Sequence, residues 1–277
     1  MRQLTKGFLW MLVVCVGLLA SCQKSEQQQA QQKPEQQQPQ QKPEQQQPAA
    51  PVKEMPQPAP EQVAAQPGKT AAPPKSTDEQ LVPLDIKLPK PMFVGTPTNI
   101  AVPNLEKPLG RPRPAFLAPA GTKNVALKKP ITGSDEQPII GELSMITDGD
   151  KEAGEGSFVE LGPMLQYVTI DLKGRTTIYA IVVWHYHKQA VVYHDVIVQV
   201  ADDKDFVTNV QTVFNNDIDN TSGRGVGKDM SYVETAEGKL IDARGVQGRY
   251  VRLYSRGNTA NDLNHYIEVE VYGKAVQ

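Results

Sequence analysis

The chain has 277 residues, and its 29 lysine and arginine residues nearly balance 31 aspartate and glutamate residues, for a formal net charge of −2. This balance excludes the strongly basic character by which nucleic-acid-binding proteins neutralise phosphates, so we expect no nucleic-acid partner. The 2 cysteines, Cys15 and Cys22, both lie near the N-terminus. The fold is therefore expected to form without a disulfide.

Residues 1–21 have the features of a signal peptide. Two basic residues precede an apolar run from Phe8 to Ala20, which is too short to cross a bilayer core of about 30 Å as a helix. The run ends in Leu19-Ala20-Ser21-Cys22 and so resembles the lipobox of bacterial lipoproteins. The resemblance implies cleavage before Cys22 and a diacylglycerol group on its sulfur. We expect a lipid-anchored protein of the cell envelope, at the outer membrane if the cell is Gram-negative; an ordinary signal peptide with a chance cysteine is the alternative.

Residues 22–80 have the composition of a disordered linker. The unit Lys33-Pro34-Glu35-Gln36-Gln37-Gln38-Pro39 recurs at residues 42–48. A segment with so few apolar side chains cannot offset the entropy lost on ordering, and its prolines favour an extended polyproline II spacer. Residues 81–120 contain more apolar residues but also many prolines. We expect an irregular arm there, which could lie across the surface of the following domain.

The remaining part of the chain, residues 121–274, shows a period of two rather than 3.6. Apolar and polar residues alternate in Tyr167–Leu172, Tyr250–Tyr254 and Ile267–Tyr272, as they do in strands with one buried face. Ile178–Trp184 is apolar on both faces, which predicts a central strand, and Val192–Val200 also alternates. Short intervals containing glycine, asparagine and aspartate separate these runs, so we expect an all-β sandwich or barrel.

Several short motifs occur in order along this part of the chain. They are Asn124-Val125-Ala126-Leu127, Ile146-Thr147-Asp148-Gly149-Asp150, Val168-Thr169-Ile170-Asp171-Leu172, Val198-Gln199-Val200-Ala201, Arg249-Tyr250-Val251-Arg252-Leu253 and Glu268-Val269-Glu270-Val271-Tyr272-Gly273. In this order they resemble discoidin domains, also called coagulation-factor type C domains. The resemblance implies a galactose-binding-like jelly-roll β-sandwich with ligand loops at one end. It also implies, as in bacterial carbohydrate-binding members, a structural calcium ion.

The chain departs from the pattern of that family in two places that bear on the site. Residues 202–206 replace the usual glycine-tryptophan pairing, and the segment after Asp150 is longer than usual and lacks a tryptophan. The candidate calcium ligands are Asp148, Asp150 and Glu268, since a turn can direct several carboxylate and carbonyl oxygens to one point. The resemblance places the closing-strand Glu268 beside this loop. The alternative is an ordinary Asp-Gly turn and an acidic residue on a solvent-facing strand position.

Three of the 4 histidines lie close together, at positions 185, 187 and 194. His185 and His187 are two residues apart, so on a strand they point to the same side, and Tyr186 between them offers a ring to a sugar. A polar loop before the last strand adds Asn258, Asn264 and His265. We expect these residues to form a ligand face at one end of the sandwich, with purely structural hydrogen bonding or a transition-metal site as alternatives. His194 is expected in the core.

Together these features predict a non-catalytic envelope protein that binds carbohydrate through the loops of its sandwich. The alternative is a structural protein whose sandwich docks onto an envelope partner. No residues group as a recognisable nucleophile, base and acid, so an enzyme is not expected. The glycine-rich stretch 223–228 lacks the spacing of a phosphate-binding loop and opens no helix.

Overall fold

The computed structural model describes residues 79–93 and 99–276. The predicted signal peptide, the lipidation site Cys22 and nearly all of the predicted linker lie outside these residues. Within the part that is described, no helix is both long and apolar enough to cross a membrane.

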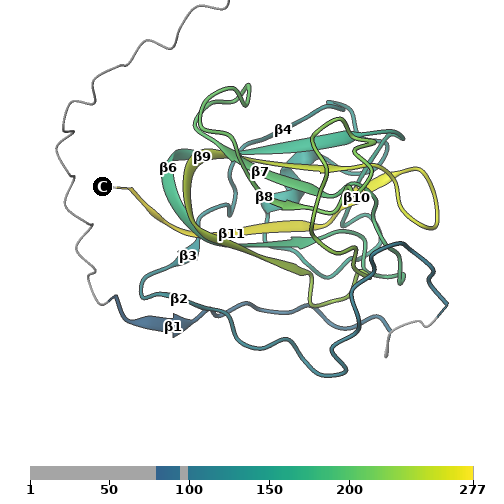
Figure 1. The fold of residues 1–277 in the computed structure, drawn as a ribbon, viewed down its shortest axis with the longest axis horizontal. Coiled ribbons are helices and arrows are strands. Elements are labelled where there is room, and N and C mark those ends of the chain that lie inside the picture. Colours follow the sequence, from purple (N-terminus) through teal and green to yellow (C-terminus); the bar gives the residue numbers. More distant parts are fainter. Residues whose placement is uncertain (1–78, 94–98, 277) are drawn as a thin grey trace, which may run out of the picture. The chain divides into compact units, whose positions relative to one another are not determined.

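The described chain consists of short and long antiparallel strands and one 3₁₀ helix (Figure 1). In chain order these are β1 (Leu81–Pro83), β2 (Leu117–Pro119), β3 (Lys123–Asn124), β4 (Ile131–Gly133), η1 (Leu143–Thr147), β5 (Val159–Leu161), β6 (Gln166–Trp184), β7 (Ile197–Ala201), β8 (Gln211–Asn215), β9 (Lys239–Ser255), β10 (Asn264–Tyr266) and β11 (Glu268–Ala275). This confirms the predicted all-β sandwich.

The two long strands, β6 and β9, belong to both layers of the sandwich. Residues 176–183 of β6 pair with residues 239–248 of β9 in a layer that continues through β11 to β3. Residues 166–171 of β6 pair with residues 250–255 of β9 in a second layer that includes β4, β7 and β8. A strand can change layers in this way where a bulge bends it. One hydrogen-bonded sheet therefore folds over on itself to enclose the core.

The bend in β6 lies between Asp171 and Thr176, where the pairing register with β9 shifts. Lys173 has a positive φ of 67° there, and its backbone N–H donates to the Asp171 carboxylate. Arg249 of β9 donates two hydrogen bonds to the same carboxylate, from Nε at 2.8 Å and Nη2 at 2.9 Å. These hydrogen bonds, those from Arg249 first, hold the pKa of Asp171 well below its usual range. This bidentate pair joins the two long strands where both change layers.

The core between the layers is formed by apolar side chains that alternate along each strand. Val168 and Ile170 point inward from one half of β6, and Ile181 and Val183 from the other half. They meet the inward residues of β7, β9 and β11. The period of two seen in the sequence thus corresponds to this enclosed face.

The opposite face of β6 and β11 is also buried, under the described parts of residues 81–120, namely 81–93 and 99–120, which we call the arm. Ala180, Val182 and Trp184 on β6 form an outer apolar cluster. Leu84, Ile86 and Phe116 of the arm are partly buried against it. In Figure 1 the arm, with β1 and β2, runs along the side of the sheet that carries β11. The arm therefore adds a third layer over one face of the sandwich.

The outer face of the last strand is covered as well, by the loop that follows η1. Glu268 and Glu270 alternate with inward valines, as the sequence pattern predicts, but their exposed fractions are only 0% and 7%. Lys151 donates to Glu270 Oε1 at 2.8 Å and Tyr272 donates to Glu270 Oε2 at 2.8 Å. The two glutamates that would face water in a two-layer sandwich are thus enclosed.

We predict that Phe116→Ala destabilises the sandwich, because it removes a ring that covers the outer cluster. A loss of about 2 kcal/mol is expected, less than for a fully buried ring, and Tm should fall by about 4–8 °C. Thermal unfolding followed by circular dichroism measures this. The neighbouring Leu117 is 53% exposed, so Leu117→Ala is the matched control and should change the free energy of unfolding by less than about 0.5 kcal/mol. Equal effects of the two changes would show that the arm adds no stability.

Candidate functional site

The predicted ligand face is not open to solvent. His185 and His187 have exposed fractions of 0%, and His265 has 7%. Their burial argues against a solvent-open ligand face at these three side chains. The reason is that β6 continues into the protein at its C-terminal end, where residues 151–158 and 232–236 cover it.

Each buried histidine has at least one ring nitrogen close to another group, whereas His185 Nε2 and His187 Nδ1 are buried with no hydrogen-bond partner among the described residues. His185 Nδ1 lies 2.6 Å from a carboxylate oxygen of Glu234, and its ring stacks on Tyr193 with a centroid distance of 4.3 Å. The Tyr193 hydroxyl lies 2.9 Å from His265 Nδ1, and His265 Nε2 lies 3.0 Å from Glu160. Burial lowers the pKa of His265 and raises that of Tyr193. A neutral imidazole that donates to Glu160 and accepts from Tyr193 fits this arrangement.

His187 and the remaining predicted ligand residues also have structural partners. His187 Nε2 donates to the backbone carbonyl of Lys151 at 2.9 Å. Asn264 is 0% exposed, and its side chain joins the backbone of Gly257 to that of residues 162 and 164. Asn258 holds its own turn through hydrogen bonds to residues 260–263. Tyr186, two residues beyond the end of β6, is half-buried against Phe158. Burial thus favours the alternative of structural hydrogen bonding for this set.

His194, expected in the core, is instead partly exposed. The reason is the backbone of the next residue, Asp195, which has a φ of 50°. This left-handed residue breaks the alternation that the sequence shows from Val192 to Val200. As a result Tyr193 is buried, and regular pairing begins only at Ile197.

The candidate calcium residues are brought together in part. The backbone N–H of Gly149 donates to Glu268 Oε2 at 3.1 Å, so the loop does lie beside the closing strand. Glu268 Oε1 is buried and has no hydrogen-bond partner among the described residues. Burial, followed by the charges of Glu270 and Asp148, raises the pKa of Glu268 to about 9. An unpartnered buried carboxylate oxygen beside an acidic turn fits a hard cation. Asp150 instead accepts the N–H of Glu152 and does not contact Glu268.

A second acidic group was not found by sequence reasoning. Asp195, Asp217 and Asp219 can bring carboxylate oxygens within 4.8 Å of one another, and within the described ranges they are the one set of three or more potential metal-binding side chains that does so. Asp217 is buried and accepts hydrogen bonds from Thr221 and Ser222. Asp195 lies close to Asp217 and Asp219 because of the turn before β7. The alternation of the sequence does not predict that turn.

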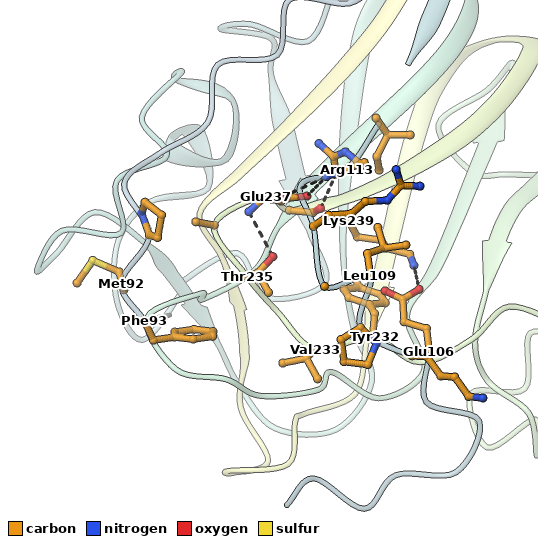
Figure 2. Close-up of a pocket in the computed structure, with 18 residues that line it drawn as sticks. Met92, Phe93, Glu106, Leu109, Arg113, Tyr232, Val233, Thr235, Glu237 and Lys239 are labelled. Atoms are coloured by element: carbon orange, nitrogen blue, oxygen red, sulfur yellow. Dashed lines mark hydrogen bonds and ion pairs between the residues drawn. The ribbon is translucent and has the colours of Figure 1, made fainter. Parts of the chain in front are cut away.

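A cleft lies between the arm and the start of β9 (Figure 2). It has a volume of about 650 Å³. The arm contributes residues 91–93, 106–111 and 113 to its walls, and the domain contributes residues 232, 233 and 235–240. Figure 2 shows Met92 and Phe93 on one side, with Arg113, Glu106 and Lys239 on the other. The cleft thus combines apolar and charged walls, which is typical of sites for small ligands.

The domain wall of the cleft is held in place by Trp184. The indole N–H donates to the carbonyl of Ala236 at 3.0 Å, and the ring lies directly against Gly238. A Cβ on Gly238 would come within 2.7 Å of the ring, and the residue has a φ of 64°. Only glycine therefore suits both the contact and the backbone at this position. Arg113 of the arm then donates from Nη1 to the Gly238 carbonyl at 2.8 Å, which links the two walls.

Sequence reasoning missed this cleft because its walls are more than a hundred residues apart along the chain. The one local signal is in Arg111-Pro112-Arg113-Pro114, where cations alternate with prolines that fix an extended backbone. Such a stretch presents charged side chains without forming a strand of a sheet.

No protein-family model matches the chain, and no curated protein matches it. Solved structures that are similar include chitosan-binding module 1 of a chitosanase/glucanase from Paenibacillus sp. IK-5, with 20% identity over 55% of this chain and 99% of that chain, at a TM-score of 0.36. A fucose-binding module of Streptococcus pneumoniae, SpX-3, has 18% identity over 54% and 97%, at 0.38. The CBM32 of AlyQ, in complex with 4,5-unsaturated mannuronic acid, has 16% identity over 51% and 92%, at 0.37. Similarities at this level assign no ligand to this chain.

We predict that the histidines differ in their reactivity toward diethylpyrocarbonate under native conditions. His194 should be modified first, because it alone of the four is partly exposed, whereas His185 and His187 should react only after denaturation. Peptide mapping by mass spectrometry measures the extent at each site. A denatured sample, in which all four react, is the control. Rapid native modification of His185 or His187 would show that the end of β6 opens to solvent.

Proposed function

We propose that this protein is a lipid-anchored, non-catalytic binding protein of the cell envelope, and that it recognises carbohydrate in the cleft between its arm and its sandwich. The observation that carries the proposal is the cleft itself, a cavity of about 650 Å³ with apolar and hydrogen-bonding groups on facing walls. A saccharide needs both, since its ring has apolar faces and its rim carries hydroxyls. The resemblance to discoidin domains implies the same class of ligand.

The residues of the cleft suggest how a sugar would be held. Phe93 is half-buried, with neighbouring Met92 exposed beside it, so their side chains can pack on the apolar face of a pyranose. On the opposite wall Arg113 and Glu237 offer a guanidinium donor and a carboxylate acceptor. Both are already oriented, because the guanidinium donates to the Gly238 carbonyl at 2.8 Å and the Glu237 carboxylate accepts the backbone N–H of Arg113 at 3.2 Å. Pre-oriented partners reduce the entropy lost on binding.

The proposed site differs in position from the one expected from the sequence. Residues 185–187 belong to the interior end of the sandwich, whereas the cleft lies along the arm. In this proposal, anchoring through a lipid on Cys22 would keep the cleft near the membrane surface.

The alternative, a structural protein that docks onto an envelope partner, is favoured by one observation. Met92 and Leu109 at the cleft are 49% and 63% exposed, and large exposed apolar side chains are common where proteins associate. The saccharide experiment below separates the two functions.

We predict millimolar to micromolar binding of at least one oligosaccharide class by the full mature chain, measured by glycan array and then by isothermal titration calorimetry. Phe93→Ala should weaken this binding about 10-fold, the loss of about 1.4 kcal/mol expected for one ring contact. Val207→Ala is the control, since Val207 is 80% exposed and does not line the cleft. Absence of any saccharide binding, with a retained envelope partner in co-purification, would favour the docking function instead.

We further propose that Glu268, with the loop at Asp148 and Asp150, holds a structural calcium ion. Calcium should raise Tm relative to a chelated sample, because a ligand that binds only the folded state stabilises it. Glu268→Gln should abolish this rise, since it removes the buried charge that compensates the ion.

Glu136→Gln is the matched control for the calcium experiment. Glu136 is exposed, and its side chain makes no hydrogen bond to another described residue, so the control should respond to calcium as the unaltered protein does. Equal melting temperatures with calcium and with chelator for the unaltered protein would remove these residues as calcium ligands.

A further inference from the structure

The cleft between the arm and the sandwich has an uneven distribution of charge. Four cationic side chains line it, from Lys107, Arg111, Arg113 and Lys239, against two acidic ones, from Glu106 and Glu237. Three of the cations belong to the arm. The excess of positive charge is therefore a property of the arm rather than of the sandwich.

Both acidic side chains already have partners inside the cleft. Glu106 accepts a hydrogen bond from Lys239 Nζ at 2.6 Å, and Lys239 is fixed further by lying 4.7 Å from the centroid of the Tyr232 ring. The Glu237 carboxylate accepts the backbone N–H of Arg113 at 3.2 and 3.4 Å. Glu106 therefore has a cationic partner in Lys239, and Glu237 lies close enough to Arg113 for their charges to interact. Lys107 and Arg111 have no acidic partner among the described residues.

Arg113 is the most constrained of these cations. Its Nη1 donates to the Gly238 carbonyl at 2.8 Å, while the other N–H groups of its guanidinium make no hydrogen bond to a described residue. A guanidinium has five N–H donors in a planar fork that matches a carboxylate. Burial lowers the pKa of Arg113 because the cation has lost part of its hydration, and the nearby charge of Glu237 offsets this only in part. A ligand carboxylate beside Arg113 would stabilise the cation further.

Lys107 and Arg111 lie at the mouth of the same cleft. Both are exposed, and neither side chain makes a hydrogen bond or ion pair with another residue in the described ranges. Their charges therefore extend into the solvent in front of the cleft. Cations arranged around a concave site attract anions and raise their local concentration.

We propose that the saccharide bound in this cleft is acidic, a uronic-acid oligosaccharide whose carboxylate is held by Arg113 and attracted by Lys107 and Arg111. This inference rests on the proposed carbohydrate function and specifies its ligand class. The apolar wall at Phe93 contacts the sugar ring, and the cationic wall contacts the carboxylate. Neutral saccharides of the same size lack the second contact.

The experiment compares an oligouronate with a neutral oligosaccharide of equal length, by isothermal titration calorimetry on the full mature chain at two salt concentrations. The double variant Lys107→Gln, Arg111→Gln is compared with Lys228→Gln, Arg244→Gln. The second pair removes the same charge from exposed residues that do not line the cleft. Because all four side chains are exposed, neither double variant should fail to fold, and thermal unfolding confirms this.

We expect the oligouronate to bind at least about 10-fold more tightly than the neutral sugar and to lose most of this advantage in high salt, since exposed charges are screened. The arm variant should lose the same advantage, whereas the control pair should retain it. A sulfated oligosaccharide in the same titration distinguishes recognition of a carboxylate from general attraction of anions.

Three results would overturn the inference. Equal affinity for neutral and acidic sugars would leave carbohydrate binding intact but would show that the cleft does not prefer uronic acids. Equal weakening by both double variants would mean that overall charge, not the arm, attracts the ligand. Binding of no saccharide at all would overturn the proposed function, and the inference with it.

Discussion

The structure depends above all on the burial of both faces of β6. A strand in a two-layer sandwich has one face in the core and one in water, but Ala180, Val182 and Trp184 are enclosed on the second side as well. The arm provides this cover with its own apolar residues. Because the covering segment does not belong to the sheet, a space remains between the two, and this space is the cleft. The requirement to bury the outer face of β6 thus creates the site.

The interior also contains unusual polar groups. Glu268 and Glu270 occupy outward positions, yet the loop after η1 closes over them. At the inner end of the sandwich, His185, Tyr193 and His265 form a buried network with Glu160 and Glu234. Such networks are costly unless their members are paired. In both places, polar side chains hold loops against the sandwich through hydrogen bonds.

Periodicity predicted most of the strands, because alternation is a local property of the chain. Tyr167–Leu172 and Ile178–Trp184 are strands, although they form one continuous β6 bent at Lys173 rather than two strands with a turn. The burial of His185 and His187 could not be predicted in the same way, since it depends on segments that lie some thirty to fifty residues away and cover them. The cleft could not be predicted either. The proline-rich arm has no regular alternation of apolar and polar residues, so the sequence does not indicate which of its side chains face the sandwich.

The position of the arm has a mechanical consequence. Its base is β1, joined to β2 by three residue pairs, and Glu79 just before it pairs with Lys274 of β11. Tension applied to the chain ahead of residue 79 would act on these few contacts first, well before the long pairing of β6 with β9. The arm would then peel from the sheet while the sandwich stayed folded. A load on the N-terminal side would in this way dismantle one wall of the cleft and release whatever it holds.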